Sequence, residues 1–299
     1  MGIHMSRDQV TKSVLLINDM AGYGKVALSV MIPILSHLRH QVFNLPTALV
    51  SNTLDYGVFD IQETTDYMRR AIDAWDKLDF SFDAVATGFL VSEGQTKLVR
   101  DFCRTSRDAG AHIFVDPIMG DEGALYNGVT EQTVDYMREM CGVAHVIMPN
   151  FTEAAFLADR FRDRVGDPAG LMRTEALELV QALAALGAES VVVTSCVVDG
   201  QHATLVLDAD GTFTVLPYDE VPVRFPGTGD IFSSVLIGRM LSGAGIVNAT
   251  QAAMDTVRSL LVDNANQPDT FKGIPIELHL DRIASLAPLP ADGNCGGEA

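Results

Sequence analysis

Two glycines and a carboxylate stand together in the segment 225–230, Phe-Pro-Gly-Thr-Gly-Asp, directly before an apolar stretch. If a helix begins here, the unpaired N–H groups of its first turn and its dipole would attract an anion. The glycines would let that anion approach the backbone closely. A carboxylate would repel an anion, so Asp230 is better explained as a base that takes a proton from a hydroxyl attacking a bound phosphoryl group.

The chemistry that this segment predicts is phosphoryl transfer to a small alcohol. The alternative is that Asp230 only caps the helix, as Asp commonly does near a helix N-terminus. Taken alone, a G-x-G-D pattern favours the capping alternative, because short motifs recur by chance. Whether Asp230 is a catalytic base or a helix cap therefore has to be judged from the residues elsewhere in the chain that would lie beside it.

The composition favours a globular protein with a hydrophobic core. Hydrophobic residues make up 47% of the 299 residues, and the formal net charge is −18. Such a charge repels nucleic acid and anionic membrane surfaces, and no apolar run reaches the roughly 18 residues of a membrane span. An anionic substrate such as ATP would then need local donors and a cation, which indicates Mg²⁺.

The cysteines and the termini predict a cytoplasmic protein of one domain. The four cysteines form no C-x-x-C pair, as expected for reduced thiols, and the N-terminus lacks a signal-peptide layout. Residues 1–4 are interpreted as a remnant of cloning, residues 5–287 as a single domain, and the Pro- and Gly-containing tail 288–299 as flexible.

Short apolar runs alternate with longer segments of helical period. Strands are predicted at residues 14–17, 42–49, 84–87, 112–115, 146–148 and 191–194, and a hairpin at 203–208 and 212–216. Helices are predicted at residues 26–38, 64–77, 94–109, 130–141, 153–158, 174–186, 229–241 and 247–262. This alternation predicts an α/β protein whose parallel sheet is covered by helices on both faces.

Polar residues follow nearly every predicted strand. Because right-handed crossovers bring the strand C-terminal ends to one edge, these residues are expected to meet there. The expected turn 18–25 carries Asp19 but fits neither a P-loop nor a dinucleotide fingerprint. The later strand ends carry Asp116, then Asn150 with Glu153, then Thr194 with Ser195.

Two of these strand ends have simple structural alternatives. Asp116 could hold Mg²⁺ through water or cap a helix. Asn150 and Glu153 have the spacing of a capping box, which does not exclude a role near a metal. The hydroxyls of Thr194 and Ser195 could bond phosphate oxygens. As a set on one edge, these residues favour a functional site more strongly than any one of them does.

This ordered set resembles the ribokinase superfamily, and within it the vitamin B6 kinases and the related hydroxymethylpyrimidine kinases. The resemblance rests on the segments 116–120 (DPIMG), 149–153 (PNFTE), 194–195 (TS) and 227–230 (GTGD), in that order, within residues 14–262. It implies a three-layer αβα sandwich without a separate lid domain, usually a homodimer. The implied reaction transfers the γ-phosphate of ATP to a hydroxymethyl group on a heteroaromatic ring, with Mg²⁺ and often K⁺.

The resemblance also implies roles for individual residues. Asp230 matches the catalytic base, and the anion hole matches Gly227, Thr228 and Gly229. Positions that match the nucleotide side are Asp116, Asn150, Glu153, Thr194, Ser195, Val223 and Phe225, of which Asp116 and Glu153 match the metal region.

The substrate side departs from the family pattern. The residues that the resemblance assigns to the substrate side are Asp19, Ser51, Asn52, Thr53, Asp55 and Phe89. Many pyridoxal kinases carry Ser where this chain has Asp19, and an acid would suit an amine or a ring N–H⁺. This favours pyridoxamine or pyridoxine. The alternatives are a hydroxymethylpyrimidine kinase and, more remotely, a non-catalytic nucleotide sensor, which would not need a base beside the anion hole.

Overall fold

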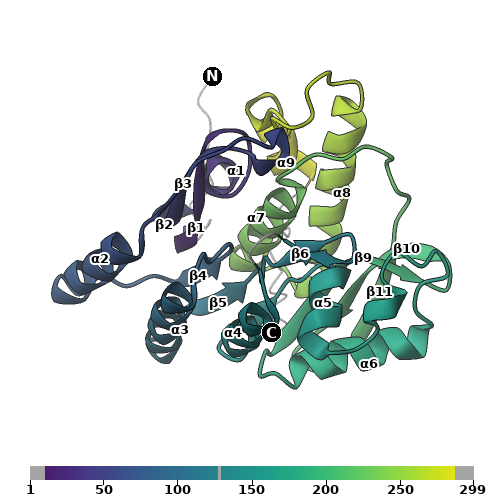
Figure 1. Ribbon diagram of the computed structural model, residues 1–299, viewed down its shortest axis with the longest axis horizontal. Helices are drawn as coiled ribbons and strands as arrows, with labels where there is room; N and C mark the ends of the chain where they lie inside the picture. Colours follow the sequence, from purple (N-terminus) through teal and green to yellow (C-terminus); the bar gives the residue numbers. More distant parts are fainter. Residues whose placement is uncertain (1–10, 127–128, 287–299) are drawn as a thin grey trace, which may run out of the picture.

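The central element of the molecule is a nine-stranded sheet (Figure 1). The computed structural model describes residues 11–126 and 129–286, so the expected remnant 1–4 and the expected flexible tail 288–299 lie outside the described residues. The strand order is β11-β10-β9-β8-β5-β4-β1-β2-β3. The strands from β9 to β2 run parallel to their neighbours, while β10, β11 and β3 are antiparallel additions at the two edges.

The strands have the following bounds. The sheet contains β1 (Ser13–Tyr23), β2 (Gln41–Asn52), β3 (Ile61–Glu63), β4 (Ala84–Thr87), β5 (His112–Val115), β8 (Val146–Ile147), β9 (Ser190–Val198), β10 (Gln201–Leu207) and β11 (Phe213–Pro217). A separate small hairpin is formed by β6 (Gly120–Asp121) and β7 (Ala124–Leu125).

Helices cover both faces of the sheet. One hydrophobic core lies under α2 (Thr65–Lys77), α3 (Glu93–Asp108), α4 (Glu131–Cys141), α5 (Phe151–Ala158) and α6 (Arg173–Ala184). The other lies under α1 (Leu28–His37), α7 (Thr228–Leu241), α8 (Ile246–Asn264) and α9 (Leu280–Leu286). The expected three-layer αβα sandwich is confirmed.

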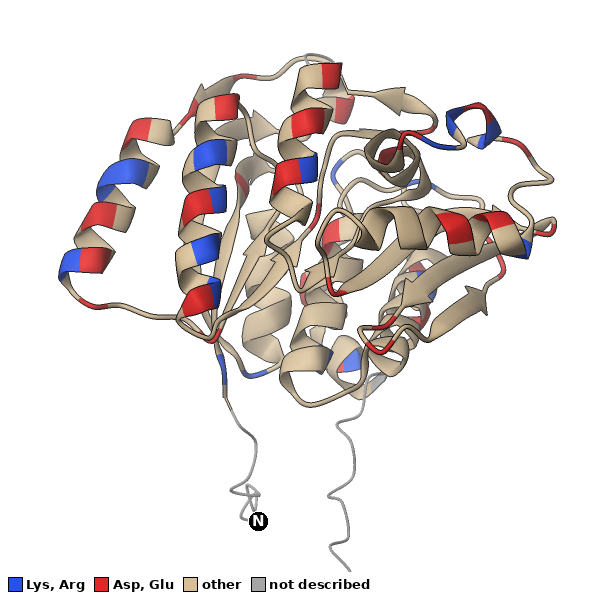
Figure 2. Ribbon diagram, turned by 90° about the horizontal axis from the view of Figure 1, so that it is seen from below, with Lys and Arg blue, Asp and Glu red and all other residues tan. Residues whose placement is uncertain are grey.

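Alternating side chains of each buried strand divide between the two cores. In β1, Leu15 and Ile17 belong to one core and Val14 and Leu16 to the other. This follows from the two-residue period of a strand, and it explains why the run is continuously apolar. Figure 2 shows the charged residues on the outer helices and the connecting loops, around strands that are largely uncharged.

Two predicted strand ends were wrong. Residues 18–25 were expected to form a turn, but β1 continues to Tyr23 and pairs with β2 up to Asn52, after an irregularity between Asn18 and Met20. Past the level at which β1 stops pairing with β4, β1 and β2 still pair with each other. Their hydrogen bonds stabilise an extended backbone there that local propensity does not indicate. Likewise β9 continues to Val198.

The described part of the chain holds no separate lid domain, since its strands beyond the main sheet are those of the β6–β7 hairpin. None of the described helices is long and apolar enough to cross a membrane. The assignment of residues 5–287 to a single domain stays a prediction.

Candidate active site

One edge of the parallel sheet gathers most of the expected site residues. The parallel pairings β1–β4, β4–β5 and β5–β8 end at one level, where Ile17, Thr87, Val115 and Ile147 stand side by side in register. Gly88 and Asp116 directly follow β4 and β5 at this level, whereas Asn18 lies within β1, which continues beside β2. Helix α7 brings the segment 227–230 to the same edge, because Asp230 bonds to β1 and to the N-terminus of α1.

Asp230 lies in the first turn of α7 with both carboxylate oxygens engaged. The backbone N–H of Ala27, the N-cap residue of α1, donates to Oδ2 at 2.8 Å, and the side-chain amide of Asn18 donates to Oδ1 at 3.3 Å. Burial raises the pKa of Asp230 to about 6, while the two hydrogen bonds oppose this rise. A carboxyl with this pKa is ionised near neutral pH and can accept a proton.

The two glycines of the G-x-G-D segment have different physical roles. Gly227 is the N-cap of α7 with φ +84°, and an added Cβ would lie 2.2 Å from the carbonyl oxygen of Lys25. Only glycine fits there. A Cβ at Gly229 would meet no heavy atom within 4 Å, so the space beside the first turn of α7 is open. An anion could reach the unpaired N–H groups of this turn from that side.

Asp116 follows β5 and stands near Asp230. The hydroxyl of Ser233, one turn further along α7, donates to its Oδ2 at 3.0 Å. Burial, and next the charge of Asp230, raise the pKa of Asp116 to about 7, against the effect of the Ser233 bond. The two carboxyls therefore interact electrostatically, and a cation placed beside them would favour their ionised forms.

Asn150 and Glu153 form the capping box that their spacing indicates. The Asn150 side chain accepts from the N–H of Glu153, and Glu153 Oε2 accepts from the N–H of Asn150, both at 2.9 Å. The other oxygen of Glu153 accepts from Met119 N–H at 2.9 Å, so this buried carboxyl holds the loop after Asp116. Burial and the charge of Asp116 raise its pKa well above the ordinary value.

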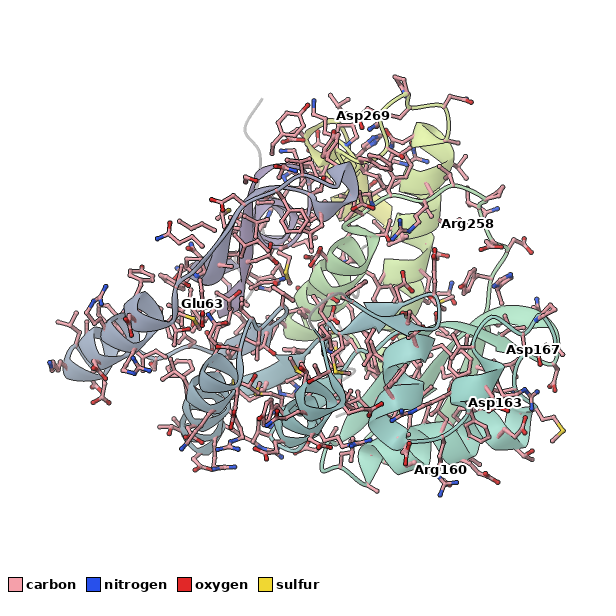
Figure 3. All side chains as sticks on the ribbon, viewed as in Figure 1. Glu63, Arg160, Asp163, Asp167, Arg258 and Asp269 are labelled. Atoms are coloured by element: carbon pink, nitrogen blue, oxygen red, sulfur yellow. The ribbon has the colours of Figure 1, made fainter. Side chains whose placement is uncertain are left out.

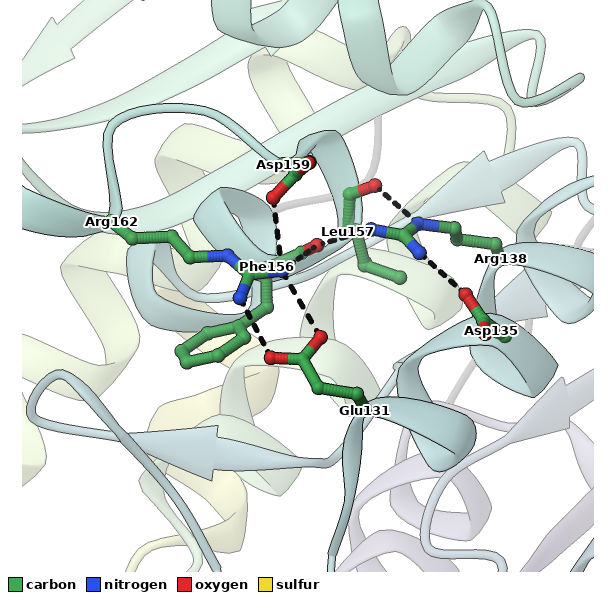
Figure 4. Close-up of polar contacts among 7 residues, drawn as sticks. All are labelled: Glu131, Asp135, Arg138, Phe156, Leu157, Asp159 and Arg162. Atoms are coloured by element: carbon green, nitrogen blue, oxygen red, sulfur yellow. Dashed lines mark hydrogen bonds and ion pairs between the residues drawn. The ribbon is translucent and has the colours of Figure 1, made fainter.

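The opposite end of α5 is held by two arginines (Figure 4). Arg138 donates to the carbonyls of Phe156 and Leu157, each at 2.8 Å, and Arg162 stacks over the Phe156 ring. Cations at a helix C-terminus complete its last carbonyls and complement its dipole. These contacts keep α5 in place, and with it the N-terminal turn that carries Glu153.

Asp19 faces the same acidic centre from β1. Burial, and next the charge of Asp230, raise its pKa to about 7. Among the described residues no Lys, Arg or His side chain forms an ion pair with it. A cationic ligand group would therefore gain from contact with Asp19. Phe89, after β4, is half-buried at the same edge, and its N–H bonds to Asn18 at 2.8 Å.

The expected residues of the segment 51–55 mainly brace their own loop. The Ser51 hydroxyl donates to Asn52 at 2.7 Å, and the Asn52 amide donates to the carbonyl of Val58 at 2.9 Å. Thr53 is buried and donates to the carbonyl of Phe271 at 2.7 Å.

Asp55 and Tyr56 connect the loop after β2 to other loops of the molecule. Asp55 forms an ion pair with Arg224 at 3.2 Å, and the same guanidinium lies 3.6 Å from Glu122 in the β6–β7 hairpin. Tyr56 donates to Asp269, labelled in Figure 3, at 2.6 Å. The loop after β2 is thus fastened to the segment before α7 and to the loop after α8.

The expected nucleotide-side residues occupy different environments. Thr194 and Ser195 lie inside β9, where Thr194 N–H bonds to the carbonyl of Pro149 at 3.0 Å and Ser195 is exposed with φ +59°. Phe225 is 3% exposed and belongs to the core under α7, so its ring supports the segment 227–230 that follows it. Val223 is half-buried against the same core.

Three residues at the site were missed by the sequence reasoning: Asn18, Ala27 and Arg224. Asn18 had a signal, since it is a polar residue that directly ends a buried apolar run. The other two had none, because a backbone N–H and a surface ion pair depend on neighbours distant in the sequence.

The arrangement suits a cation that is shared with phosphate oxygens. No group of three or more His, Cys, Asp or Glu side chains within the described ranges could hold a metal alone. Mg²⁺ usually takes one or two carboxylates together with water and substrate phosphates. Asp116, half-buried at the open edge, fits such a ligand, whereas both oxygens of Glu153 already accept backbone N–H groups.

An αβα sheet with a half-buried carboxylate beside an open helix N-terminus at one edge agrees with the class of small-molecule kinases. The family model described as Phosphomethylpyrimidine kinase matches residues 34–273, and the chain belongs to this family. The expected position in the ribokinase superfamily is thereby confirmed.

Similar proteins include kinases of vitamin B6. The chain is 29% identical to a pyridoxine/pyridoxal/pyridoxamine kinase of Bordetella avium, over 77% of this chain and 78% of that protein. It resembles, with 32% identity and a TM-score of 0.85, a Bacteroides thetaiotaomicron protein named as a candidate phosphomethylpyrimidine kinase and crystallised with pyridoxal (92% and 96% covered). Pyridoxal kinase of Lactobacillus plantarum has 25% identity and a TM-score of 0.80 (92% and 97% covered).

Proposed function

We propose that this kinase transfers the γ-phosphate of ATP to the 5′-hydroxymethyl group of a vitamin B6 vitamer: pyridoxal, pyridoxamine or pyridoxine. The observation that carries the proposal is the carboxylate of Asp230 beside the open N-terminal turn of α7. This arrangement supports the proposal, because attack by a hydroxyl on a phosphoryl group requires a proton acceptor next to an anion site. The names of the similar proteins favour a B6 ring as the acceptor.

In this mechanism Asp230 accepts the proton of the substrate hydroxyl as the hydroxyl oxygen attacks the γ-phosphorus, while the bond from that phosphorus to the β,γ-bridging oxygen breaks and ADP leaves. The N–H groups of the first turn of α7, at Thr228 and Gly229, stabilise the negative charge that develops on the phosphoryl oxygens. The N–H group of Gly227 and the dipole of α7 add to this effect. One well-placed donor of this kind contributes about 2.7–4 kcal/mol in other enzymes, so these amides carry a large part of the catalysis.

On the nucleotide side, Asp116 is proposed to hold Mg²⁺, directly or through water, with Glu153 and Asn150 positioning the loop around it. Bound Mg²⁺ would neutralise phosphate charge in a site that otherwise repels ATP. Thr194, Ser195 and Val223 are proposed to line the nucleotide, with Phe225 behind them. A K⁺ requirement is proposed from the family resemblance alone.

On the substrate side, Asp19 and Phe89 are proposed to contact the ring. The carboxyl of Asp19, which has no ion-pair partner within residues 11–126 and 129–286, favours a vitamer that carries an amine or a protonated ring nitrogen, which is pyridoxamine or pyridoxine. Ser51, Asn52, Thr53 and Asp55 are proposed to shape the pocket through the loop that they brace. We further propose a cytoplasmic homodimer, which size-exclusion chromatography with light scattering would test.

A side-by-side substrate panel tests the proposal. Purified protein with ATP and Mg²⁺ is offered pyridoxal, pyridoxamine, pyridoxine and hydroxymethylpyrimidine, and both ADP release and the phosphorylated product are measured. The proposal expects the highest kcat/KM with a B6 vitamer. A preference for hydroxymethylpyrimidine would support the kinase of thiamine synthesis instead, and no product with any ring would contradict the proposed function.

A further inference from the structure

We propose that Asn18 is the positioning residue of this enzyme: its side-chain amide fastens the catalytic carboxylate of Asp230 to the wall of the substrate pocket. This inference rests on the proposed function, because it takes Asp230 as the base. Asn18 is not expected to touch the substrate. It acts through the groups that it bonds.

The contacts of Asn18 connect three separate segments. Its Nδ2 donates to Asp230 Oδ1 at 3.3 Å, across 212 residues of sequence. Its Oδ1 accepts from the backbone N–H groups of Asp19 at 3.0 Å and Phe89 at 2.8 Å. One amide group therefore contacts the base on α7 and both residues proposed to contact the ring.

The surroundings leave the Asn18 side chain little freedom. It is 2% exposed, and its Nδ2 also lies 3.5 Å from the sulfur of Met31 in α1. An added Cβ at Gly88 would lie 2.4–2.6 Å from the Asn18 amide atoms, so the chain passes against the amide where only glycine fits. A buried amide that is bonded on both its donor and its acceptor side is held in one orientation.

The amide has two effects on the reaction. First, it favours the ionised form of Asp230, because a donor to a carboxylate stabilises the charge, and the N–H of Ala27 acts in the same way. The titratable groups that face Asp230 are Asp19 from β1 and Asp116 after β5; burial, and next the charge of Asp230, raise the pKa of each. Second, it fixes the distance between the base and the ring, on which the attack geometry depends.

The decisive variant is Asn18→Asp. It keeps the shape of the side chain and oxygen acceptors for Asp19 and Phe89, but it loses the donor to Asp230. We expect kcat to fall by about 10²-fold, with the KM for ATP changed less than about twofold. The acidic limb of the pH profile of kcat/KM should move to higher pH by about one unit, because the base loses a donor and gains a negative neighbour.

Met31→Leu is the matched control, since it removes the other partner of the amide and keeps the bond to Asp230; kcat and the pH profile should then stay near those of the wild type. Thermal unfolding checks that both variants fold. A second measurement does not depend on the substrate: the Asp230 carboxyl carbon is titrated by ¹³C NMR in the ligand-free wild type and in Asn18→Asp.

An upward shift of the Asp230 titration in Asn18→Asp supports the inference even if the physiological substrate is another alcohol. An unchanged titration overturns it. If the wild type phosphorylates a vitamer and Asn18→Asp retains its kcat and pH profile, the inference fails while the proposed function stands. If no ring is phosphorylated but the titration moves, the proposed function fails and the positioning of Asp230 by Asn18 stands.

Discussion

The proposed chemistry depends on Asp230, whose hydrogen-bond partners and burial suit it to the role of a base. Two donors engage its oxygens, while burial raises its pKa to about 6. Burial, and next the charge of Asp230, raise the pKa values of Asp19 and Asp116 to about 7. Carboxyls whose charges interact in this way titrate as a group, and binding of a cationic partner would ionise them together.

Asp230→Asn should leave the fold and ATP binding intact but lower kcat by about 10²–10⁴-fold, the usual contribution of general base catalysis. The reason is that an amide of the same size keeps the packing and cannot take the proton. A coupled ADP assay measures the rate, and nucleotide titration by calorimetry measures the binding. A near-normal rate would show that another group is the base.

The same residue predicts the pH dependence of activity. In the free enzyme, kcat/KM should fall as the pH drops through about 6, because protonated Asp230 cannot act as a base. Rate measurements between pH 5 and 8 at saturating Mg²⁺ check this. A profile that is flat down to pH 5 would contradict the assignment.

Asp19 should decide the preference among vitamers. Asp19→Ser should lower kcat/KM for pyridoxamine by about tenfold relative to pyridoxal, because the lost charge contributes the electrostatic part of binding. Competition assays with both vitamers measure the ratio. Equal efficiency of the wild type and the variant on pyridoxamine would rule out a charge contact between Asp19 and the amine.

At the scale of elements, the N-termini of two helices converge on the site. Helix α7 provides the open first turn, and α1 contributes the N–H of its N-cap residue Ala27 to Asp230. Ala27 has φ +48° and ψ −133°, a conformation that non-glycine residues rarely adopt. Contacts with distant segments therefore fix the positions of both helices. Helix α5 is held by Arg138 at its C-terminal end and by its own capping box at its N-terminal end.

Gly227 and Gly229, at the N-terminus of α7, form a matched pair for testing the proposed anion site. Gly229→Ala should unfold at a temperature close to that of the wild type, because its Cβ has free space, but it should raise the KM for ATP or lower kcat by at least about tenfold by filling the place of an anion. Gly227→Ala should instead destabilise the fold, since its Cβ would meet the carbonyl of Lys25 at 2.2 Å. Thermal unfolding and ATP kinetics of both variants separate the two roles. Unchanged kinetics in Gly229→Ala would place the phosphates elsewhere.

At the scale of the whole molecule, buried acids couple stability to pH. Asp19, Asp116 and Asp230 have pKa values raised to about 6–7 in the folded state, while an unfolded chain has about 3.9. Between these values the folded state binds more protons, so its stability falls as the pH rises. Binding of a cation at this edge would offset part of that loss.

Asp19→Asn should therefore raise the unfolding temperature at pH 8 and change it little at pH 4, because an amide carries no charge that burial penalises. The expected gain is about 2–4 °C for each kcal/mol of relieved cost. Asp73→Asn, an exposed acid on α2, serves as the control for net charge. An equal gain in both variants at pH 8 would assign the effect to net charge rather than to the site.

Much of the fold followed from patterns in the sequence. The predicted helices lie within a few residues of the observed ones, and the strands 84–87 and 112–115 agree with β4 and β5. Local hydrophobic period determines such elements. The ends of β1 and β9 were missed because their last residues are extended only through pairing with other strands.

The sequence by itself determined which chemical groups are present: the G-x-G-D segment, the capping box of Asn150 and Glu153, and the acids at the strand ends. These depend on residue type and short spacing, which a sequence states directly. Only the tertiary structure decided their environment. It brought Asn18 and Ala27 to Asp230 across more than 200 residues, buried Phe225 in the core and engaged the residues of the segment 51–55 in loop contacts. Burial and long-range contacts set the pKa values and the open space of the site, and both arise only when the sheet and its two helix layers assemble.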